Sequence, residues 1–238
     1  MEIRWIEQTG STNSYLKERL HTMEPLTFVF AKEQTAGRGQ RGNSWEAEPG
    51  KNLTFSLNIK PEISPKEQFA ISEAAALGIV TMLQDHGIHA MVKWPNDIYA
   101  GDKKICGILI ENSVMGTEIS RSVIGVGLNV NQTVFLSDAP NPVSMKMITG
   151  KGYDLKSLAR EIASTMAGKL ELLRQRHSLH KEYMARLWRG DGRSYPFKDN
   201  VTGETFEGKI KAVELSGHLL LDDGQKTRQY AFKEVTFL

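Results

Sequence analysis

The sequence predicts an α+β fold, in which a mixed or antiparallel sheet flanked by helices is followed by a small β-barrel. Three observations predict it. Short apolar strands follow one another at hairpin spacing between residues 90 and 130, long helical patterns lie on both sides of them, and the last ~45 residues alternate short strands with turn pairs. With 238 residues, one main domain over 1–189 and a small one over 190–238 are expected.

Composition limits the classes of protein. The 30 Lys and Arg against 28 Asp and Glu give a net charge of +2, which removes the main electrostatic reason to expect a nucleic-acid or membrane-surface protein. Cys106 is the single cysteine, so no internal disulfide can form, and we expect this thiol in the core. The first residues lack the apolar segment of a signal peptide. These features predict a soluble, cytoplasmic protein without membrane contact.

The first sixty residues contain three expected elements and one long loop. The Ser-Thr-Asn triplet at 11–13 precedes an apolar stripe and predicts a hydroxyl-capped helix over 12–21. β-branched and aromatic residues predict a strand over 26–31, and alternation predicts a half-buried strand over 53–59. Between them, 33–51 holds four glycines and almost no apolar side chain, as is typical of a functional loop.

Two helices enclose the central strands. Pro65 opens an Ala-rich helix that is expected to reach His86 and end at Gly87. Asp154 is expected to cap a second helix, with helical sequence continuing towards Trp188. Strands are expected over 91–94, 98–100, 105–112 and 119–130, and, in the C-terminal part, over 195–197, 205–213, 218–221 and 228–232.

The segment 37–42, Gly-Arg-Gly-Gln-Arg-Gly, matches the G-x-G-x-x-G pattern of dinucleotide-binding folds. The sequence after it does not predict a helix, so the helix N-terminus that receives a pyrophosphate is missing and a Rossmann-type oxidoreductase is disfavoured. An anion-binding loop fits better, because Arg38 and Arg41 offer planar forks for a carboxylate or phosphate and the glycines admit a ligand close to the backbone. A flexible surface loop with solvated arginines is the alternative.

Two further clusters could carry chemistry. The segment 93–97, Lys-Trp-Pro-Asn-Asp, turns the chain at a strand end, where Asp97 could orient an amine or bind magnesium; a plain turn is equally compatible. Lys104 begins a very apolar strand, where partial desolvation strengthens attraction for an anion, although a solvated hairpin lysine is the simpler interpretation. Gly107 is costly inside a strand unless a group approaches its backbone closely, and the glycines of 125–129 lie in an apolar strand either to admit a ligand or to form a bulge.

Taken together and in this order, the clusters resemble the biotin protein ligases, which join biotin to a lysine of a carrier domain. The segments that carry the resemblance are Ser11-Thr12-Asn13, Gln34 to Gly39, Lys93 to Asp97, Lys104 with Gly107, and Gly125 to Asn129. The resemblance covers essentially the whole chain and implies a class II synthetase-like catalytic domain with an SH3-like C-terminal domain. It also implies a two-step reaction, in which biotin and MgATP form biotinyl-5′-AMP and the carrier lysine then attacks this anhydride.

The resemblance implies site residues as well. Lys104 and Arg38, with Mg²⁺, are expected to neutralise charge as the biotin carboxylate attacks the α-phosphate, and Asp97 to orient or deprotonate the lysine. The residues implied to bind biotin are Ser11, Thr12, Asn13, Gln34, Gly37, Arg38, Gly39, Gln40, Lys104, Gly107 and Gly125. Those implied to bind ATP or the adenylate are Arg38, Arg41, Trp45, Asn52, Lys93, Asn96, Lys104 and Asn129. ATP and Mg²⁺ are the expected cofactors, and metal ligands are not predicted.

The expected partner is a biotin carboxyl carrier domain of the acetyl-CoA carboxylase type, and a homodimer is open. The family often has arginine at the position of Gln40 and a basic residue at that of Asn43, so phosphate contacts and adenylate retention are expected to differ here. Ser11 lies too close to the start for a DNA-reading helix to precede it, so ligase activity without operator binding is expected. A lipoate ligase or transferase and a non-catalytic biotin-binding regulator are the rival interpretations.

Overall fold

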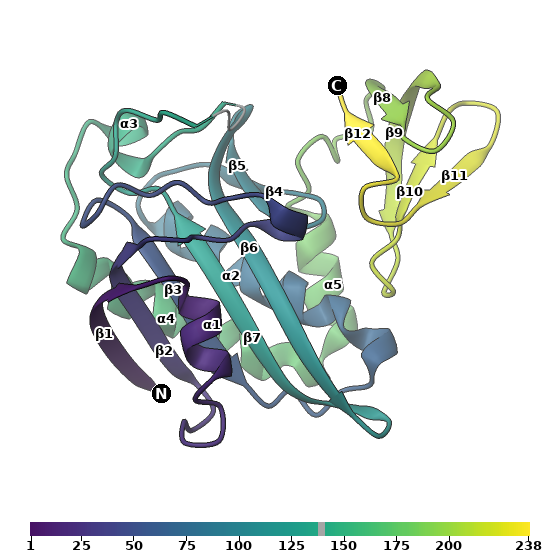
Figure 1. The fold of residues 1–238 in the computed structure, drawn as a ribbon. Helices are drawn as coiled ribbons and strands as arrows, with labels where there is room; N and C mark the ends of the chain where they lie inside the picture. Colours follow the sequence, from purple (N-terminus) through teal and green to yellow (C-terminus); the bar gives the residue numbers. More distant parts are fainter. Residues whose placement is uncertain (138–140) are drawn as a thin grey trace.

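Two sheets organise the chain (Figure 1). The computed structural model describes residues 1–137 and 141–238, except the side chain of Arg41. The strands of the larger sheet are β1 Glu2–Thr9, β2 Thr27–Gln34, β3 Leu53–Ile59, β4 Ala90–Lys93, β5 Asp97–Ala100, β6 Lys103–Met115 and β7 Glu118–Leu128. Their order is β1-β2-β3-β7-β6-β5-β4, and every neighbouring pair is antiparallel except the parallel pair of β1 and β2. The predicted sheet is therefore confirmed as a mixed sheet.

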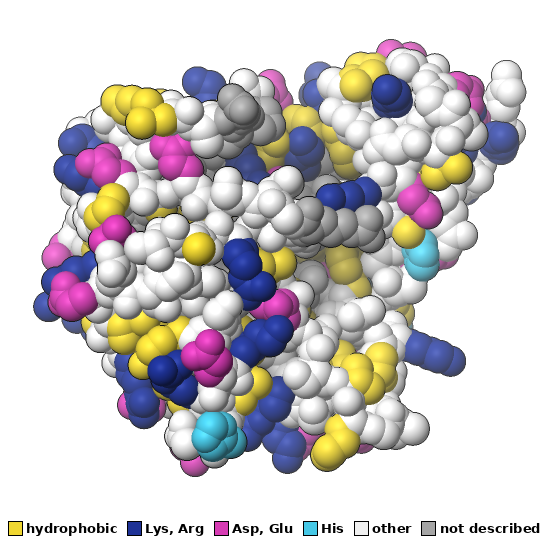
Figure 2. Space-filling model, viewed as in Figure 1, with side chains coloured by type: hydrophobic (Ala, Val, Ile, Leu, Met, Phe, Trp, Pro, Cys, Tyr) yellow, Lys and Arg dark blue, Asp and Glu magenta, His cyan; other side chains and the backbone are white. Residues whose placement is uncertain are grey.

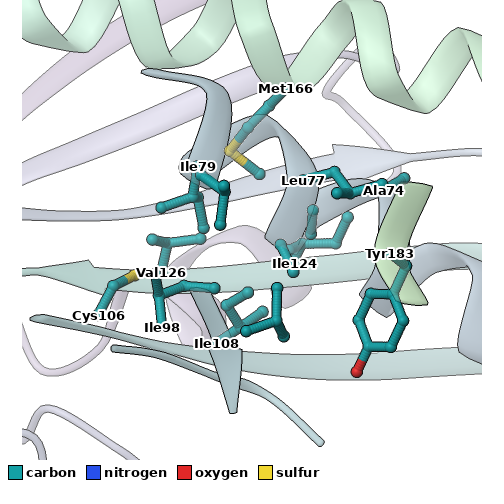
Figure 3. Close-up of a cluster of buried hydrophobic side chains, with 14 of the residues drawn as sticks. Ala74, Leu77, Ile79, Ile98, Cys106, Ile108, Ile124, Val126, Met166 and Tyr183 are labelled. Carbon is teal, nitrogen blue, oxygen red and sulfur yellow. The ribbon is translucent and has the colours of Figure 1, made fainter. Parts of the chain in front are cut away.

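Helices cover both faces of this sheet. They are α1 Thr12–Lys17, α2 Phe69–Asp85, α3 Met145–Thr149, α4 Leu155–Glu171 and α5 Arg176–Met184. Figure 1 shows α2, α4 and α5 behind the sheet and the short α1 in front of it. Helix α2 is apolar on nearly all sides because it lies between the sheet and the other two helices. In Figure 3, Ile79 of α2 lies near Val126, Ile98 and Ile108 of the sheet.

Several local predictions are confirmed by backbone and cap geometry. A 3-10 turn over Pro65–Glu67 precedes α2, and Gly87 after its end has a φ of +73°, in the left-handed region that glycine tolerates. The Asp154 side chain accepts a hydrogen bond from the Ser157 amide at 2.7 Å and caps α4. Cys106 is completely buried, and burial raises the pKa of its thiol, as expected of a core residue.

The predicted helix over 12–21 is wrong in two respects. Helix α1 ends at Lys17, and the Ser11 side chain makes no capping hydrogen bond, although its carbonyl accepts the Tyr15 amide at 3.0 Å. The reason lies in the tertiary structure, because the side chain of Ser11 faces a cavity.

Strand β3 also differs from its prediction. All seven of its residues are buried, whereas alternation predicted one solvated face. The polar face of the strand, formed by Thr54, Ser56 and Asn58, is covered by α1 and the turn after it: Ser56 Oγ lies 2.7 Å from Thr12 Oγ1, and Asn58 donates to the Met23 carbonyl. Each of the three side chains makes at least one hydrogen bond, which offsets the cost of burying it, although Asn58 Oδ1 has no partner among the described residues.

A five-stranded antiparallel sheet forms the C-terminal part. Its strands are β8 Tyr195–Asp199, β9 Thr205–Val213, β10 Leu219–Asp222, β11 Thr227–Tyr230 and β12 Val235–Phe237, in the order β11-β10-β9-β8-β12. The four strands predicted here are confirmed, and β12 is additional. Closure into an SH3-like barrel stays a prediction.

Residues 93 and 94 connect the two sheets. The Lys93 ammonium donates to the Tyr99 hydroxyl at 2.9 Å and lies 5.2 Å from the ring centroid of Trp188 and 5.6 Å from that of Phe237 in β12. Burial lowers the pKa of Lys93. Trp94, which precedes a cis proline bond, donates its indole N–H to the Gly217 carbonyl at 2.9 Å. The C-terminal sheet and its turns therefore contact the segment that leads into Asn96 and Asp97.

Charged side chains of both signs are interspersed over the face shown in Figure 2. This distribution agrees with a net charge of +2. Within the described part of the chain, no helix is both long enough and apolar enough to cross a bilayer.

A pair of helical glycines tests the packing of α2 on α4. A Cβ at Gly78 would lie 2.7 Å from the Met166 Cα, whereas one at Gly168 would meet nothing within 4 Å. We expect Gly78→Ala to lower the free energy of unfolding by about 1–3 kcal/mol through overpacking. The matched control Gly168→Ala should raise it by up to ~1 kcal/mol, because alanine favours helix. Urea unfolding measures both, and a Gly78→Ala protein as stable as the unsubstituted chain would contradict the close packing.

Candidate active site

Two adjoining cavities lie along β6, beside the turn that leads into β5. The first occupies about 470 Å³ including its open mouth and is lined by Ser11, Thr12, Asn13, Gln34, Arg38, Gly39, Gln40, Trp45, Asn96, Asp97, Lys104, Gly107, Ile108, Leu109, Gly125, Val126 and Gly127. The second, of about 860 Å³ including its mouth, lies between the larger sheet and the C-terminal sheet. Gln40, Asn96 and Ile108 line both cavities. The first cavity contains all the residues implied to bind biotin except Gly37.

One end of the first cavity is lined by oriented polar groups. The backbone amide and the hydroxyl of Thr12 both donate to Gln34 Oε1, at 2.8 and 3.0 Å. The Gln34 Nε2 therefore points away from Thr12, and a Cβ placed on Gly37 would lie 3.3 Å from it. Gln34 thus offers a hydrogen-bond donor beside the loop that begins at Gly37.

The Asn13 side chain is fixed at the same end. Its Nδ2 donates to Glu111 Oε2 at 2.8 Å and to the Leu109 carbonyl at 3.3 Å. Its Oδ1 lies 2.5 Å from Ser56 Oγ, and a Cβ on Gly125 would lie only 2.2 Å from this oxygen. Any side chain at position 125 would displace Asn13, which explains the glycine in this strand.

The other two strand glycines face the indole of Trp45. A Cβ on Gly127 would lie 2.2 Å from Trp45 Cε2, and one on Gly107 would lie 2.9 Å from Trp45 Cζ3. The predicted close approach to the Gly107 backbone is confirmed, and at both glycines the approaching group is the chain's own Trp45 side chain. The Trp45 indole nitrogen is buried without a hydrogen-bond partner among the described residues, so it is an available donor inside the cavity.

The opposite end of the cavity holds an ion pair. Lys104 Nζ lies 2.7 Å from Asp97 Oδ1, and the two side chains are 25% and 22% exposed. Strand pairing sets this geometry, since Asp97 pairs with Gly107 across β5 and β6 and the register then shifts before Tyr99 meets Lys104. The Lys104 ammonium lies 5.5 Å from the centroid of the Trp45 ring. A cation, a carboxylate and an aromatic ring therefore meet in the first cavity, and the carboxylate follows directly on Asn96, which lines both cavities.

Glu111 in β6 connects Asn13, at the polar end of the first cavity, to Arg38 in the loop after β2. Its Oε1 lies 2.9 Å from Lys17 Nζ, and its Oε2 lies 3.1 Å from Arg38 Nη2. Burial acts to raise the pKa of Glu111, but the hydrogen bonds from Lys17 and Asn13 and the charge of Arg38 outweigh it and lower the pKa. The sequence prediction missed Glu111 and Ser56; an acid directly after the apolar run 105–110 was the available signal for the first.

The loop over residues 37–45, which contains the Gly-Arg-Gly-Gln-Arg-Gly segment, folds back on itself. The Trp45 amide donates to the Gly37 carbonyl at 2.9 Å, and the Gly39 amide to the Asn43 carbonyl at 2.7 Å. Between them lies a single 3-10 turn over Gln40–Gly42. No α-helix begins after the glycines in this described segment, which confirms that the dinucleotide-binding context is missing. The Arg41 side chain lies outside the described atoms, so its expected phosphate contact stays a prediction.

Glu46 joins this loop to residues 132–137. Its carboxylate accepts hydrogen bonds from the Leu136 and Ser137 amides at 2.9 and 2.7 Å and from Gln132 Nε2 at 3.1 Å. Burial acts to raise the pKa of Glu46, but these hydrogen bonds lower it overall. Gln132 in turn accepts the Glu48 amide at 2.9 Å. The two loops are therefore held together by side chains of both.

Three residues implied to bind the nucleotide lie outside the first cavity. Asn52 accepts the Val130 amide at 2.9 Å, Asn129 donates to the Val143 carbonyl at 3.1 Å, and Lys93 lies among the aromatic rings between the sheets. By contrast, Arg38, Trp45, Asn96 and Lys104 line it. Across the described ranges, no three His, Cys, Asp or Glu side chains gather as metal ligands.

Comparison with known proteins places this arrangement in context. Residues 5–129 match the sequence profile of the biotin/lipoate A/B protein ligase family. The chain is 29% identical over 215 residues to the bifunctional ligase/repressor BirA of Salmonella typhimurium, covering 89% of this chain and 67% of that protein. It spans 61 to 67% of the lengths of four such ligase/repressors.

Two more proteins resemble the chain over most of their own length. The biotin–[acetyl-CoA-carboxylase] ligase of Mycobacterium tuberculosis is 27% identical over 230 residues, which cover 93% of this chain and 84% of that protein. The structure of the biotin protein ligase from Aquifex aeolicus in complex with biotin and ATP has a TM-score of 0.82 at 22% identity, with 99% and 97% of the two chains covered. The latter similarity concerns the fold.

Proposed function

Because the chain belongs to the biotin/lipoate A/B protein ligase family, we propose that it is an ATP-dependent biotin protein ligase. In the first step, biotin and MgATP form biotinyl-5′-AMP and pyrophosphate; in the second, biotin passes to a lysine of a carrier protein and AMP is released. The names of relatives such as the ligase of Mycobacterium tuberculosis support a biotin carboxyl carrier domain of acetyl-CoA carboxylase as the acceptor. Residues 1–189 form the proposed catalytic domain, and 190–238 the SH3-like domain.

The observation that carries this proposal is the set of oriented polar groups at one end of the first cavity. Gln34 offers a donor there, and Asn13 an acceptor. The ureido ring of biotin has two N–H donors and one carbonyl acceptor, and can satisfy both kinds of group. The dithiolane ring of lipoate has neither, so it would leave buried polar groups unpaired at a cost of about 1–3 kcal/mol each.

The opposite end suits the adenylation step. An oxygen of the biotin carboxylate attacks the α-phosphorus of ATP, and the bond to the leaving pyrophosphate breaks. Negative charge accumulates on the phosphate, so Lys104 is proposed to stabilise it, with Arg38 nearby on the loop. Magnesium is proposed to arrive with ATP and to take most of its ligands from phosphate oxygens and water. It would add positive charge at the phosphates.

The second step requires a lysine amine beside the anhydride. The second cavity is the proposed route, because it shares Asn96 with the first and adjoins Asp97. The amine nitrogen attacks the biotinyl carbonyl, the bond to the AMP phosphate oxygen breaks, and the amine loses a proton. Asp97 is proposed to orient the amine and accept this proton.

The proposal is tested by supplying MgATP with either biotin or lipoate to the purified chain and measuring pyrophosphate release. We expect release with biotin and turnover at least ~100-fold lower with lipoate, because the dithiolane ring would leave the polar groups at that end of the cavity without hydrogen-bond partners. Mass spectrometry of an added carrier domain should then show one biotinylated lysine. Preferential turnover of lipoate would identify a lipoate ligase instead, and biotin binding without pyrophosphate release would identify a regulator.

A further inference from the structure

We propose that Glu111 is a positioning residue that sets the hydrogen-bond polarity of the biotin site, and through it the choice between a ureido and a dithiolane ring. This inference rests on the proposed function and adds a specificity determinant to it. Glu111 does not line the first cavity. It acts through Asn13, which does.

The contact between Asn13 and Glu111 has a fixed direction. An ionised carboxylate only accepts hydrogen bonds, and the pKa of Glu111 is lowered despite its burial. Asn13 must therefore turn its NH₂ group towards Glu111 Oε2, at 2.8 Å, and the Leu109 carbonyl accepts from the same group. The amide oxygen of Asn13 is consequently held on the opposite side, against Gly125 and Ser56.

The same orientation continues across the floor of the site. Ser56 Oγ lies 2.5 Å from Asn13 Oδ1 and 2.7 Å from Thr12 Oγ1, so its single hydroxyl hydrogen is shared between two acceptors. Thr12 donates onward to Gln34 Oε1 at 3.0 Å, which leaves the Gln34 Nε2 as the exposed donor. The ionised carboxylate thus sets the direction of Asn13, which the Ser56 hydroxyl contacts in turn, whereas Gln34 is oriented by the Thr12 backbone amide as well as by its hydroxyl.

Two cations contact this carboxylate on different oxygens, so the Arg38 and Asn13 contacts remain when Lys17 is removed. Lys17 contacts Glu111 Oε1 at 2.9 Å, and Arg38 contacts Oε2, the oxygen that also accepts from Asn13. Lys17 is about half exposed, whereas the side chain of Glu111 is 23% exposed. Lys17 is therefore a contact that can be removed without touching Asn13 or the cavity, and it provides a matched control.

Replacing the carboxylate by an amide tests the proposal. In Glu111→Gln the side chain can also donate, so Asn13 is free to rotate and present its NH₂ group to the ligand. We expect the KM for biotin to rise by about 10- to 100-fold, with kcat and the KM for ATP changing by less than about threefold. The preference for biotin over lipoate in kcat/KM should fall by the same 10- to 100-fold factor. Lys17→Met should stay within about twofold of the unsubstituted enzyme in all these values.

Exchanging the hydrogen-bond donor and acceptor between positions 13 and 111 distinguishes a role of Glu111 in orienting Asn13 from a role in structural support alone. Asn13→Asp alone places two carboxylates together and should abolish detectable biotin turnover. The double variant Asn13→Asp/Glu111→Gln restores one donor and one acceptor and again holds an oxygen beside Gly125, so it should recover at least about a tenth of the lost kcat/KM. Thermal unfolding of each variant verifies the fold, and only folded proteins are compared.

The outcomes decide the matter in separate ways. An unchanged KM for biotin and an unchanged biotin preference in folded Glu111→Gln would overturn the role of Glu111 while leaving the proposed function intact. A double variant no better than Asn13→Asp would overturn the polarity argument. If the unsubstituted chain itself released no pyrophosphate with biotin, the proposed function would fail, and the inference with it.

Discussion

Replacement of Lys104 by alanine is expected to lower kcat/KM for biotin-dependent pyrophosphate release by about 100- to 1000-fold. Lys104 lines the first cavity, its ammonium lies 2.7 Å from Asp97, and its side chain is only 25% exposed. Partial exclusion of water strengthens its attraction for a developing phosphate charge. A coupled assay of pyrophosphate release at saturating MgATP measures the effect.

The neighbouring lysine is the matched control for this prediction. Lys103 is exposed and does not line the first cavity. Lys103→Ala should therefore retain activity within about twofold, since an exposed charge is screened by solvent. If both alanine variants behaved alike, or if Lys104→Ala kept most of its activity, Lys104 would not be the cation that serves adenylation.

The second large effect is expected from Asp97→Asn, in the transfer step. An asparagine keeps the size of the side chain but cannot accept the proton that the lysine amine must lose, so transfer should slow by about 100- to 10⁴-fold. Asp97 also pairs with Lys104, and adenylation will change as well. Preformed biotinyl-5′-AMP and a carrier domain, mixed in a single-turnover experiment, isolate the transfer step.

Asp102 provides the comparison, because it is an exposed carboxylate in the turn between β5 and β6. Asp102→Asn should transfer biotin at the rate of the unsubstituted enzyme. Undiminished single-turnover transfer by Asp97→Asn would remove the proposed role in the second step. It would leave the ion pair with Lys104 as the only function of the carboxylate.

Much of the fold could be predicted because local chemistry determines it. Pro65, Gly87 and the Asp154 cap mark helix ends through backbone preferences that act within a few residues. The C-terminal strands were equally visible from their turn pairs. Strand β1 was not predicted, since its half-buried pattern becomes a strand only by parallel pairing with β2. Long-range pairing of this kind leaves little trace in a single sequence.

The residues of the candidate site likewise fall into those that could be predicted from local sequence and those that depend on tertiary packing. The residues Lys104 and Asp97 carried recognisable chemistry in their own segments, and the structure brings them to 2.7 Å. Ser56 and Glu111 did not, because their roles depend on α1 packing over β3 and β6. Lysine is a residue type that commonly binds phosphate, yet tertiary packing surrounds Lys93 with aromatic rings.

The attachment of the C-terminal sheet through Lys93 and Trp94 has a consequence for how such a protein can diverge. Phe237 and Gly217 contact Lys93 and Trp94, which Pro95 separates from Asn96 and Asp97, so the turn carrying the carboxylate is supported from the C-terminal side. A C-terminal domain taken from a relative would have to bring matching surfaces for this lysine and this tryptophan. The two parts are therefore exchangeable only as a co-adapted pair, even though no described residue of the C-terminal sheet lines the first cavity.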